Sequence, residues 1–537
     1  MKKVVSIIAI ISAIAFSSCV KSQFADAYAD PSKVSSTTVE LQYAGFLSSN
    51  LNYTMYNYWQ YFVVYQNTVL PWTQVTPIIN TAGRFVPGVQ AESDLWNTYY
   101  GFTAQYKEIL KLNKALSAND QTSKRIYIIT AAIFYYDMTQ KVVDVFGDIP
   151  FSQAGLLSTN GGNYQASNAK YDPASTIYTS MLDDLKAIAD ELNTIAVPTG
   201  VNSVLKVQDF VNHGDLTKWK MYCNSLRLRL LTRVSGVPAF QARVTSEIAG
   251  ILGNPSSYPL IRTYTDNIKI TVTNNTSGGV NDGTGTGAGS SFYSGLIGWG
   301  SANVGGKVMI DLMNANSDPR LRAIFEPGTG ATPAGSYAGL DPSLASTSQT
   351  QTDYVATLAR YNRSTLTQNN FLPGMLINAS EVNLMLAEYY LKAGNDASAK
   401  SAYEAGITES VKYYYWVRTI SNDNAAGPLT PLGPTEISDY LAKNGIAWAN
   451  ASSTSQKWSL IGTQKWINYN VLQPLECWAE VRRTKYPVLN FIHDTGVQQV
   501  PPSRWLYPVD EHTFNKTNYQ AVAANDNFTT KIFWDVN

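Results

Sequence analysis

The sequence contains few of the residues from which catalytic and metal sites are most often built. Histidine occurs three times in 537 residues, at His213, His493 and His512, and these positions are far apart. Neither an H-E-x-x-H nor a G-x-S-x-G motif is present. The chain therefore has too few histidines for a histidine-rich metal site, and little basis for a Ser-His pair. We expect no metal, no cofactor and no catalytic residue.

Nucleotide-binding motifs are missing as well. The glycines of residues 283–289 alternate along the chain and do not make the G-x-G-x-x-G spacing of a dinucleotide site. Residues 300–307 differ from a P-loop by one position, and Val308 stands where a magnesium-binding Ser or Thr is needed. We therefore expect no nucleotide to bind at either segment.

Charged residues are scarce and balanced. They make up 15% of the chain, against roughly 25% in an average soluble protein. Lys plus Arg equal Asp plus Glu at 40 each, so the chain lacks the basic excess of a nucleic-acid-binding protein. The hydrophobic content of 45% excludes a disordered chain. The 34 tyrosines and 12 tryptophans suit polar ligands with apolar faces, such as sugars, although most aromatic residues serve core packing.

The N-terminus has the features of an export signal. Lys2 and Lys3 precede the apolar segment Val4–Phe16, whose 13 residues are too few to span a bilayer, which needs about 20. The sequence Phe16-Ser-Ser-Cys19 resembles a bacterial lipobox, in which the cysteine is lipidated. We expect a signal peptide at 1–18, lipidated Cys19 followed by a tether to residue 40, and one folded domain at 41–537. A plain secretory signal is the alternative.

Apolar residues recur at helical spacing through most of the chain. The expected helices cover residues 95–116, 126–143, 172–192 and 216–230. Asp172-Pro173 is a typical helix start, and Gly236 with Pro238 ends the fourth segment. Cys223 and Cys477 lie within apolar helical patterns and are expected to be core residues rather than a disulfide. The pattern predicts a mainly α fold without a compositional break between domains.

Residues 379–411 predict two helices joined by a tight turn. Gly394 is suited to the φ > 0 position that ends the first helix, and Asp396 to the N-cap of the second. The segment follows the tetratricopeptide pattern of small and aromatic residues at Leu386, Ala387, Tyr390, Ala399 and Tyr403. Because one such pair cannot bury its apolar faces alone, we expect a tetratricopeptide-like scaffold of several helical pairs.

Long irregular stretches interrupt the helical pattern, at 274–306, 327–370 and 422–433. Loops of this length are often functional. We therefore select aromatic and amide residues in irregular segments as candidate ligand contacts. Trp72, which follows Pro71 and is expected to be exposed, is the first of these, and the others are Tyr293, Trp299 and Asn303.

Several segments resemble motifs of the SusD/RagB family of nutrient-binding outer-membrane lipoproteins. The resemblance extends in order from Cys19 to about Asn518. A helical segment resembles the family's W-x-x-x-A-N-S-L-R-L-R, with Cys223 in place of the commoner Ala. The resembling segments are Asp144–Phe151 (DVFGDIPF), Trp219–Arg233 (WKMYCNSLRLRLLTR), Glu476–Arg483 (ECWAEVRR) with Tyr486-Pro487, and Arg504–Pro508 (RWLYP) with Glu511 and Asn515.

This resemblance implies a function without covalent chemistry. Members cover a SusC-like TonB-dependent transporter as a lid at the cell surface and deliver oligosaccharides to it. The shared motifs imply scaffold roles, in which Arg227, Arg482 and Arg483 pair with buried acids or cap helices. No ligand contact transfers with them, because those lie in variable loops. A peptide-binding lid, a secreted glycosidase using two carboxylates, and a purely structural helical scaffold remain as alternatives.

Overall fold

The computed structural model describes residues 37–272, 288–297 and 303–537. Its long helices confirm the mainly α expectation. The long helices are α3 (Val39–Ser49), α6 (Val89–Lys114), α8 (Arg125–Phe146), α10 (Ala174–Glu191), α11 (Thr199–Gln208), α12 (Leu216–Arg233), α13 (Gln241–Gly253), α14 (Ala288–Ile297), α15 (Lys307–Ala315), α19 (Ala379–Lys392), α20 (Asp396–Thr419), α22 (Thr454–Tyr469) and α23 (Pro474–Thr484). The four helices expected between residues 95 and 230 are present as α6, α8, α10 and α12, each with at least one end within a few residues of its predicted limit.

Short elements fill the connections between these helices. They are α4 (Leu51–Thr54), α5 (Val69–Trp72), α7 (Ala118–Ser123), α9 (Tyr164–Ser167), α16 (Leu321–Ile324), α17 (Ser346–Gln351), α18 (Tyr354–Thr357), α21 (Glu436–Leu441), α24 (Val509–Phe514), α25 (Lys516–Tyr519) and the π-helices η1 (Gln60–Tyr65) and η4 (Arg363–Thr367). Two of the stretches expected to be irregular therefore contain helical turns. α14 lies within 274–306, whereas α17, α18 and η4 lie within 327–370.

The strands of the described residues form three antiparallel pairs. β1 (Ile149–Pro150) pairs with β2 (Tyr171–Asp172), and β3 (Ile268–Ile270) pairs with β6 (Gly374–Ile377). β4 (Phe325–Glu326) pairs with β5 (Arg360–Tyr361). Each pair is two to four residues long, so the strands fix connections between helices and do not build a separate sheet layer.

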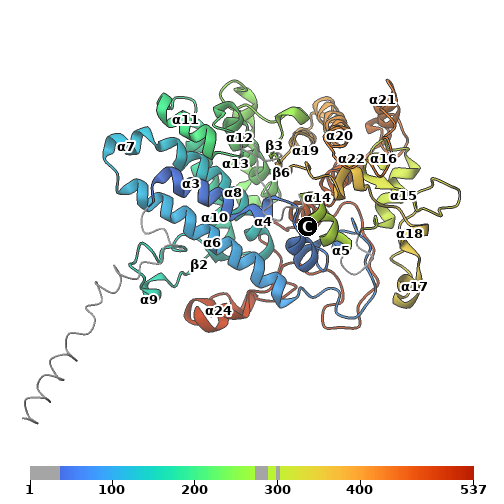
Figure 1. Ribbon diagram of the computed structural model, residues 1–537, viewed down its shortest axis with the longest axis horizontal. Helices are drawn as coiled ribbons and strands as arrows, with labels where there is room; N and C mark the ends of the chain where they lie inside the picture. The colour runs from blue at the N-terminus through green and yellow to red at the C-terminus, as the bar shows by residue number, and fades with distance from the viewer. Residues whose placement is uncertain (1–36, 273–287, 298–302) are drawn as a thin grey trace, which may run out of the picture.

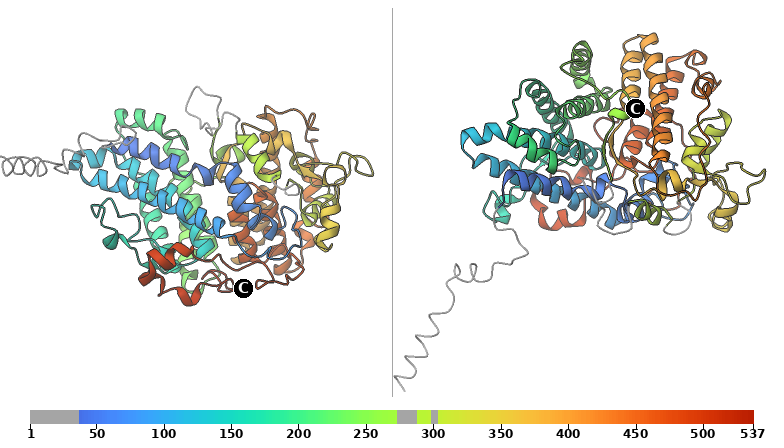
Figure 2. Two further views of the ribbon diagram at one scale, coloured as in Figure 1. Left: turned by 60° about the horizontal axis from the view of Figure 1, so that its bottom comes forward. Right: turned by 45° about the horizontal axis from the view of Figure 1, so that its top comes forward.

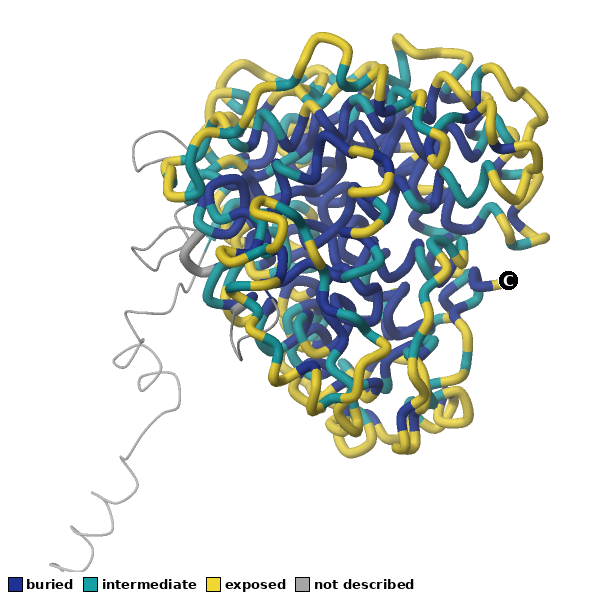
Figure 3. The backbone as a smooth tube through the Cα atoms, turned by 90° about the vertical axis from the view of Figure 1, so that its right-hand side faces the viewer, coloured by how far each residue is buried: buried dark blue, intermediate teal, exposed yellow. Residues whose placement is uncertain are grey.

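The helices form two groups on either side of the β3–β6 pair. In Figure 1, α3, α6, α8, α10 and α12 lie on the left, whereas α19, α20 and α22 lie on the right. Figure 2 shows the same separation after rotation. One continuous cluster of buried apolar side chains runs through both groups. Buried segments accordingly occupy the middle of the molecule, and exposed segments lie at its outer turns (Figure 3).

The predicted helical pair is present as α19 and α20. Gly394 has φ +74° and ends the first helix, as expected. The N-cap prediction was one residue too late, because the side chain of Asn395 accepts from the Ser398 N–H at 3.1 Å. Gly406 brings the two helices into close contact, since a Cβ atom there would lie 2.7 Å from Leu384 Cγ. Small residues thus let the two backbones approach, as the repeat pattern predicted.

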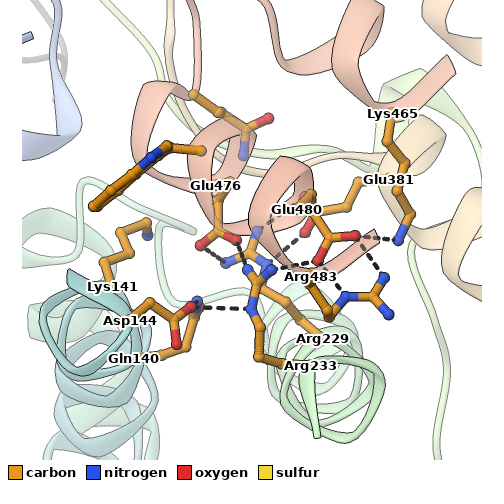
Figure 4. A network of polar contacts seen from close by, with 12 residues as sticks. Gln140, Lys141, Asp144, Arg229, Arg233, Glu381, Lys465, Glu476, Glu480 and Arg483 are labelled. Carbon is orange, nitrogen blue, oxygen red and sulfur yellow. Dashed lines mark hydrogen bonds and ion pairs between the residues drawn. The ribbon is translucent and has the colours of Figure 1, made fainter. Parts of the chain in front are cut away.

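A network of buried ion pairs joins α8, α12, α19, α22 and α23 (Figure 4). On α12, Arg229 contacts Asp137 at 2.9 Å and also pairs with Glu381. One turn further, Arg233 contacts Asp144 at 3.0 Å and two carboxylates of α23. Buried charges are costly unless they are paired, so the network fixes how these helices meet. It gives the family motifs a structural role.

The scaffold roles expected for three arginines are confirmed, since two pair with acids and the third, Arg482, caps the C-terminal turn of α8. Arg227 pairs with Glu247 at 3.0 Å, and Arg483 pairs with Glu388 at 2.7 Å. Arg482 instead donates to the backbone carbonyls of Asp144 and Ser503, with its guanidinium over the Trp478 ring. Cys223 and Cys477 are buried and unpaired, as expected, and burial raises the pKa of both thiols.

Candidate functional site

The expectation that Trp72 is an exposed ligand contact is wrong. Its side chain is 1% exposed, and its indole N–H donates to the Arg84 carbonyl at 2.9 Å. The ring packs against Trp478, with 5.6 Å between the centroids. The reason is local, because residues 69–72 form the helical turn α5 instead of an irregular loop. The stiff Pro71 therefore directs the ring inward.

The other selected residues lie in a different part of the molecule. Tyr293 is half-buried on α14, which packs against η4, the π-helix that begins at Arg363. Asn303 is buried, its backbone carbonyl accepts from the Tyr361 N–H at 2.8 Å, and its side-chain Oδ1 has no hydrogen-bond partner. Both therefore lie beside residues 361–363. Trp299 and Cys19 lie outside the described residues.

Sequence reasoning missed a group of aromatic side chains at η1, called here the aromatic ledge: Tyr58, Trp59 and Phe62. The Trp59 side chain is 44% exposed, yet its indole N–H donates to Asp94 Oδ1 at 2.7 Å. Asp94 Oδ2 in turn accepts from the Tyr53 hydroxyl at 2.6 Å. Tyr58 stacks on Phe62 with 5.1 Å between centroids and 15° between the ring planes. The ledge thus presents aromatic rings to solvent in a fixed orientation.

Helix α14 supports the ledge from behind. A Cβ atom on Gly295 would lie 2.7 Å from Tyr61 Cβ, so the α14 backbone rests directly on η1. Phe292 packs edge-on against Tyr61 and stacks on Tyr56. The sequence signal that could have found this region is the density of aromatic residues within residues 53–65. Glycine at position 295 is what allows the helix to approach so closely.

Beside the ledge lies a cleft of about 650 Å³, called here the N-terminal cleft. Val63, Gln66 and Asn67 line it from the η1 side. These residues follow Trp59 and Phe62 by about one helical turn, which places them on the same side of the segment. The Gln66 side-chain Oε1 has no hydrogen-bond partner. That oxygen is buried beneath the cleft surface, and the Asn67 amide donates to the Phe62 carbonyl at 3.1 Å, so the aromatic ledge adjoins a polar wall of amide side chains.

The far wall of the cleft, residues 76–86, is held rigidly although it has no regular secondary structure. The buried amide of Gln349 donates to the Ile78 carbonyl at 3.0 Å and accepts from the Asn80 N–H at 2.8 Å. Asp494 Oδ2 accepts from the Gly83 N–H at 2.8 Å. Side chains from distant segments thus order this wall before any ligand binds, which lowers the entropy cost of binding.

The cleft is electrically almost neutral. Among the residues that line it, Arg84 alone carries a formal charge. Its guanidinium is already engaged with the carbonyls of Thr81 and Ile492 and with the Asp494 carboxylate at 3.5 Å. Hydrogen bonds from the backbone N–H groups of Gly496 and Gly83, and the charge of Arg84, lower the pKa of Asp494. Hydroxyl and amide groups remain as the available polar contacts.

Side chains that commonly bind metal ions are dispersed in the described part of the chain. Within 37–272, 288–297 and 303–537, His, Cys, Asp and Glu side chains do not gather in any group of three or more that could hold a metal ion. No helix in the same ranges combines the length and apolarity needed to cross a membrane. Stacked aromatic rings beside a neutral, prearranged cleft are typical of a helical binding protein.

Comparison with known proteins agrees with this class. Residues 34–508 match the SusD-like family described as starch-binding and associating with the outer membrane. The chain belongs to this family, whose members are binding proteins and not enzymes. No curated protein sequence matches it.

Solved structures confirm the SusD-like α fold. A protein titled as chitin-binding is 23% identical with a TM-score of 0.70, covering 92% of this chain and 100% of that one. A SusD-like protein of Bacteroidetes AC2a is 20% identical with a TM-score of 0.73, and the match covers 93% of this chain and 100% of that one. An outer-membrane protein of Bacteroides vulgatus is 20% identical with a TM-score of 0.70, and the match covers 93% of this chain and 100% of that one.

Proposed function

We propose that this protein binds neutral oligosaccharides on the aromatic ledge and in the N-terminal cleft. The orientation of Trp59 carries the proposal, because an exposed indole fixed by Asp94 needs no reordering before a sugar ring stacks on it. The side chains of Gln66 and Asn67 line the cleft beside the ledge, and a reorientation of the Gln66 amide would bring its unpaired Oε1 to a sugar hydroxyl. A chitin-binding protein of the same fold agrees with a glycan ligand.

Two of the residues predicted from sequence, Tyr293 and Asn303, lie near the proposed site. Tyr293 and Asn303 lie on or beside elements that pack against η1 or η4, so both would contact a longer oligosaccharide. Trp299 stays a prediction from sequence. Asn303 is buried, and its side-chain Oδ1 has no hydrogen-bond partner. A ligand could reach this oxygen only by displacing the side chains that cover it. We therefore expect the ledge to dominate the affinity.

We further propose that the protein is anchored to the outer membrane through lipidated Cys19 and delivers its ligand to a SusC-like TonB-dependent transporter at the cell surface. Support comes from the lipobox-like sequence and from a family described as associating with the outer membrane. Delivery requires release as well as capture, so Kd values on the order of micromolar to millimolar suit this role. On this proposal the protein catalyses no reaction.

Titration calorimetry with chitohexaose, maltoheptaose and xylohexaose tests the ligand proposal. Replacing Trp59 by alanine removes the stacking surface and should weaken binding of the recognised oligosaccharide about tenfold or more, as loss of a central aromatic contact does. Tyr164→Ala is the matched control, since this aromatic side chain is 75% exposed on α9, outside the proposed site. It should leave affinity unchanged.

Two outcomes would contradict the proposal. If Trp59→Ala binds as tightly as the wild type while remaining folded by circular dichroism, the ledge is not the site. If the wild type binds none of a broad oligosaccharide panel but binds peptides, the ligand class is wrong. Hydrolysis of any of these oligosaccharides by the purified protein would refute the non-catalytic role.

A further inference from the structure

A second cavity, of about 690 Å³, lies where the ends of α12, α19 and α23 meet the C-terminal residues, and is called here the C-terminal pocket. It shares no lining residue with the N-terminal cleft. The C-terminus lies at one edge of the molecule in Figure 3 and moves to the lower edge in the left view of Figure 2. Val536 and Asn537, which line the pocket, are exposed, so the pocket opens at the molecular surface.

Positive charge distinguishes this pocket from the cleft. Lys392, Arg483 and Lys485 line it, and no Asp or Glu is among its lining residues. Arg483 is buried and held by Glu388, whereas Lys485 pairs with Asp535 behind the pocket wall at 2.7 Å. Lys392 is exposed, and within the described residues its ammonium group donates to the Ser235 carbonyl alone. Burial and the nearby Arg483 charge lower the pKa of Lys392.

Aromatic side chains form the walls of the same pocket. Trp458 and Tyr486 are half-buried there, and Trp534 lies buried at its inner end. The Tyr486 hydroxyl is fixed by Ser455 at 2.9 Å, which orients the ring. The terminal carboxylate of Asn537 also lines the pocket, and one of its oxygens already accepts from Lys531, which balances its charge. Rigid aromatic faces thus line the same pocket as the Lys392 ammonium group, for which no ion pair is found among the described residues.

We propose that the C-terminal pocket binds an acidic saccharide, one that carries carboxylate or sulfate groups. The aromatic walls stack on the apolar faces of the sugar ring, as in any sugar site. The ammonium group of Lys392 pairs with the anionic substituent, in a charge-assisted hydrogen bond that replaces its bond to Ser235. The neutral cleft and the positive pocket therefore select different ligands, and the inference does not rest on binding at the ledge.

Calorimetry on the full chain at low ionic strength tests this inference with paired probes. Trigalacturonate is compared with its methyl ester, and neocarratetraose sulfate with its desulfated form. These pairs separate carboxylate from sulfate recognition. We expect at least one acidic probe to bind tenfold or more tighter than its neutral partner, with affinity falling as salt is added. Lys392→Gln should remove most of that preference, and Lys392→Arg should retain it.

Control variants connect the result to this pocket. Lys186→Gln removes a lysine that is 53% exposed on α10 and should change nothing. Trp458→Ala should weaken the acidic probe, whereas Trp59→Ala at the ledge should not. Equal binding of acidic and neutral probes, or unchanged binding by Lys392→Gln, overturns the proposal. Loss of the acidic probe in Trp59→Ala also overturns it, because that places the ligand at the ledge.

Discussion

Replacing Arg233 by methionine should destabilise the fold strongly, because the arginine is the central cation of the buried network. It is 1% exposed and contacts Asp144 at 3.0 Å and Glu476 at 2.5 Å, and it also pairs with Glu480. Methionine keeps a similar unbranched chain but removes the charge. Three carboxylates from α8 and α23 would then face one another with fewer cations between them.

The size of the effect follows from burial. Removing one partner of a buried ion pair typically costs about 3–5 kcal/mol, because the remaining charge stays desolvated. Arg125→Met is a matched control on the protein surface. Arg125 contacts Glu191 at 2.8 Å, but the two side chains are 42% and 34% exposed. Such a pair contributes about 0–1 kcal/mol. The loss of unfolding free energy should thus be several kcal/mol larger for Arg233→Met than for Arg125→Met.

The pH dependence provides a second test of the same variant. Burial raises the pKa of Asp144, and Arg233 opposes that shift. Without the arginine the pKa of Asp144 rises further in the folded state. An acid with a raised folded pKa stabilises the fold below its unfolded pKa and loses that contribution as pH rises through the folded value. Arg233→Met should therefore be closer to wild type at pH 5 than at pH 7.5.

Urea unfolding of both variants at the two pH values measures these differences. We expect a large fall in unfolding free energy for Arg233→Met at pH 7.5, a smaller fall at pH 5, and almost none for Arg125→Met. Equal destabilisation by the two substitutions would refute the argument from burial. A loss of stability for Arg233→Met that does not depend on pH would refute the argument from the uncompensated carboxylates.

Three further predictions concern a buried acid, the helical pair and the anchor. Burial raises the pKa of Glu92 to about 8, so the folded protein is destabilised when this carboxyl ionises at higher pH. Glu92→Gln should therefore add about 1–3 kcal/mol of unfolding free energy at pH 8 and little at pH 4.5. Urea unfolding measures both values, and no gain at pH 8 would contradict the prediction. Gly406→Ala should cost about 1–3 kcal/mol by contact with Leu384, whereas Gly250→Ala, with open space around it, should stabilise its helix; equal thermal shifts would be the contrary result. Cys19→Ala should release the protein from cell membranes on fractionation, and a wild type found wholly in the periplasm would exclude the anchor.

The sequence by itself was sufficient for α6, α8, α10, α12 and the α19–α20 pair, although not for every end of these helices. Pro173 immediately precedes α10, and Gly394 ends α19 with φ +74°. Such signals are local, since proline fixes its own φ and glycine readily adopts a positive φ, whatever lies far along the chain. The family motifs were equally visible, and they correspond to helices that meet at the buried ion pairs. Their partners could not be assigned from sequence, because Arg233 lies more than 240 residues from Glu476 along the chain.

The candidate site depended on tertiary structure. Trp59 and Trp72 lie 13 positions apart in the same aromatic segment, yet one is 44% exposed and the other 1%. Trp478, far along the chain, packs on Trp72, whereas Asp94 holds only the edge of the Trp59 ring. Local pattern indicates which side chains share a face of a helix. Whether that face is covered depends on a distant segment, and only the packed chain brings the two together.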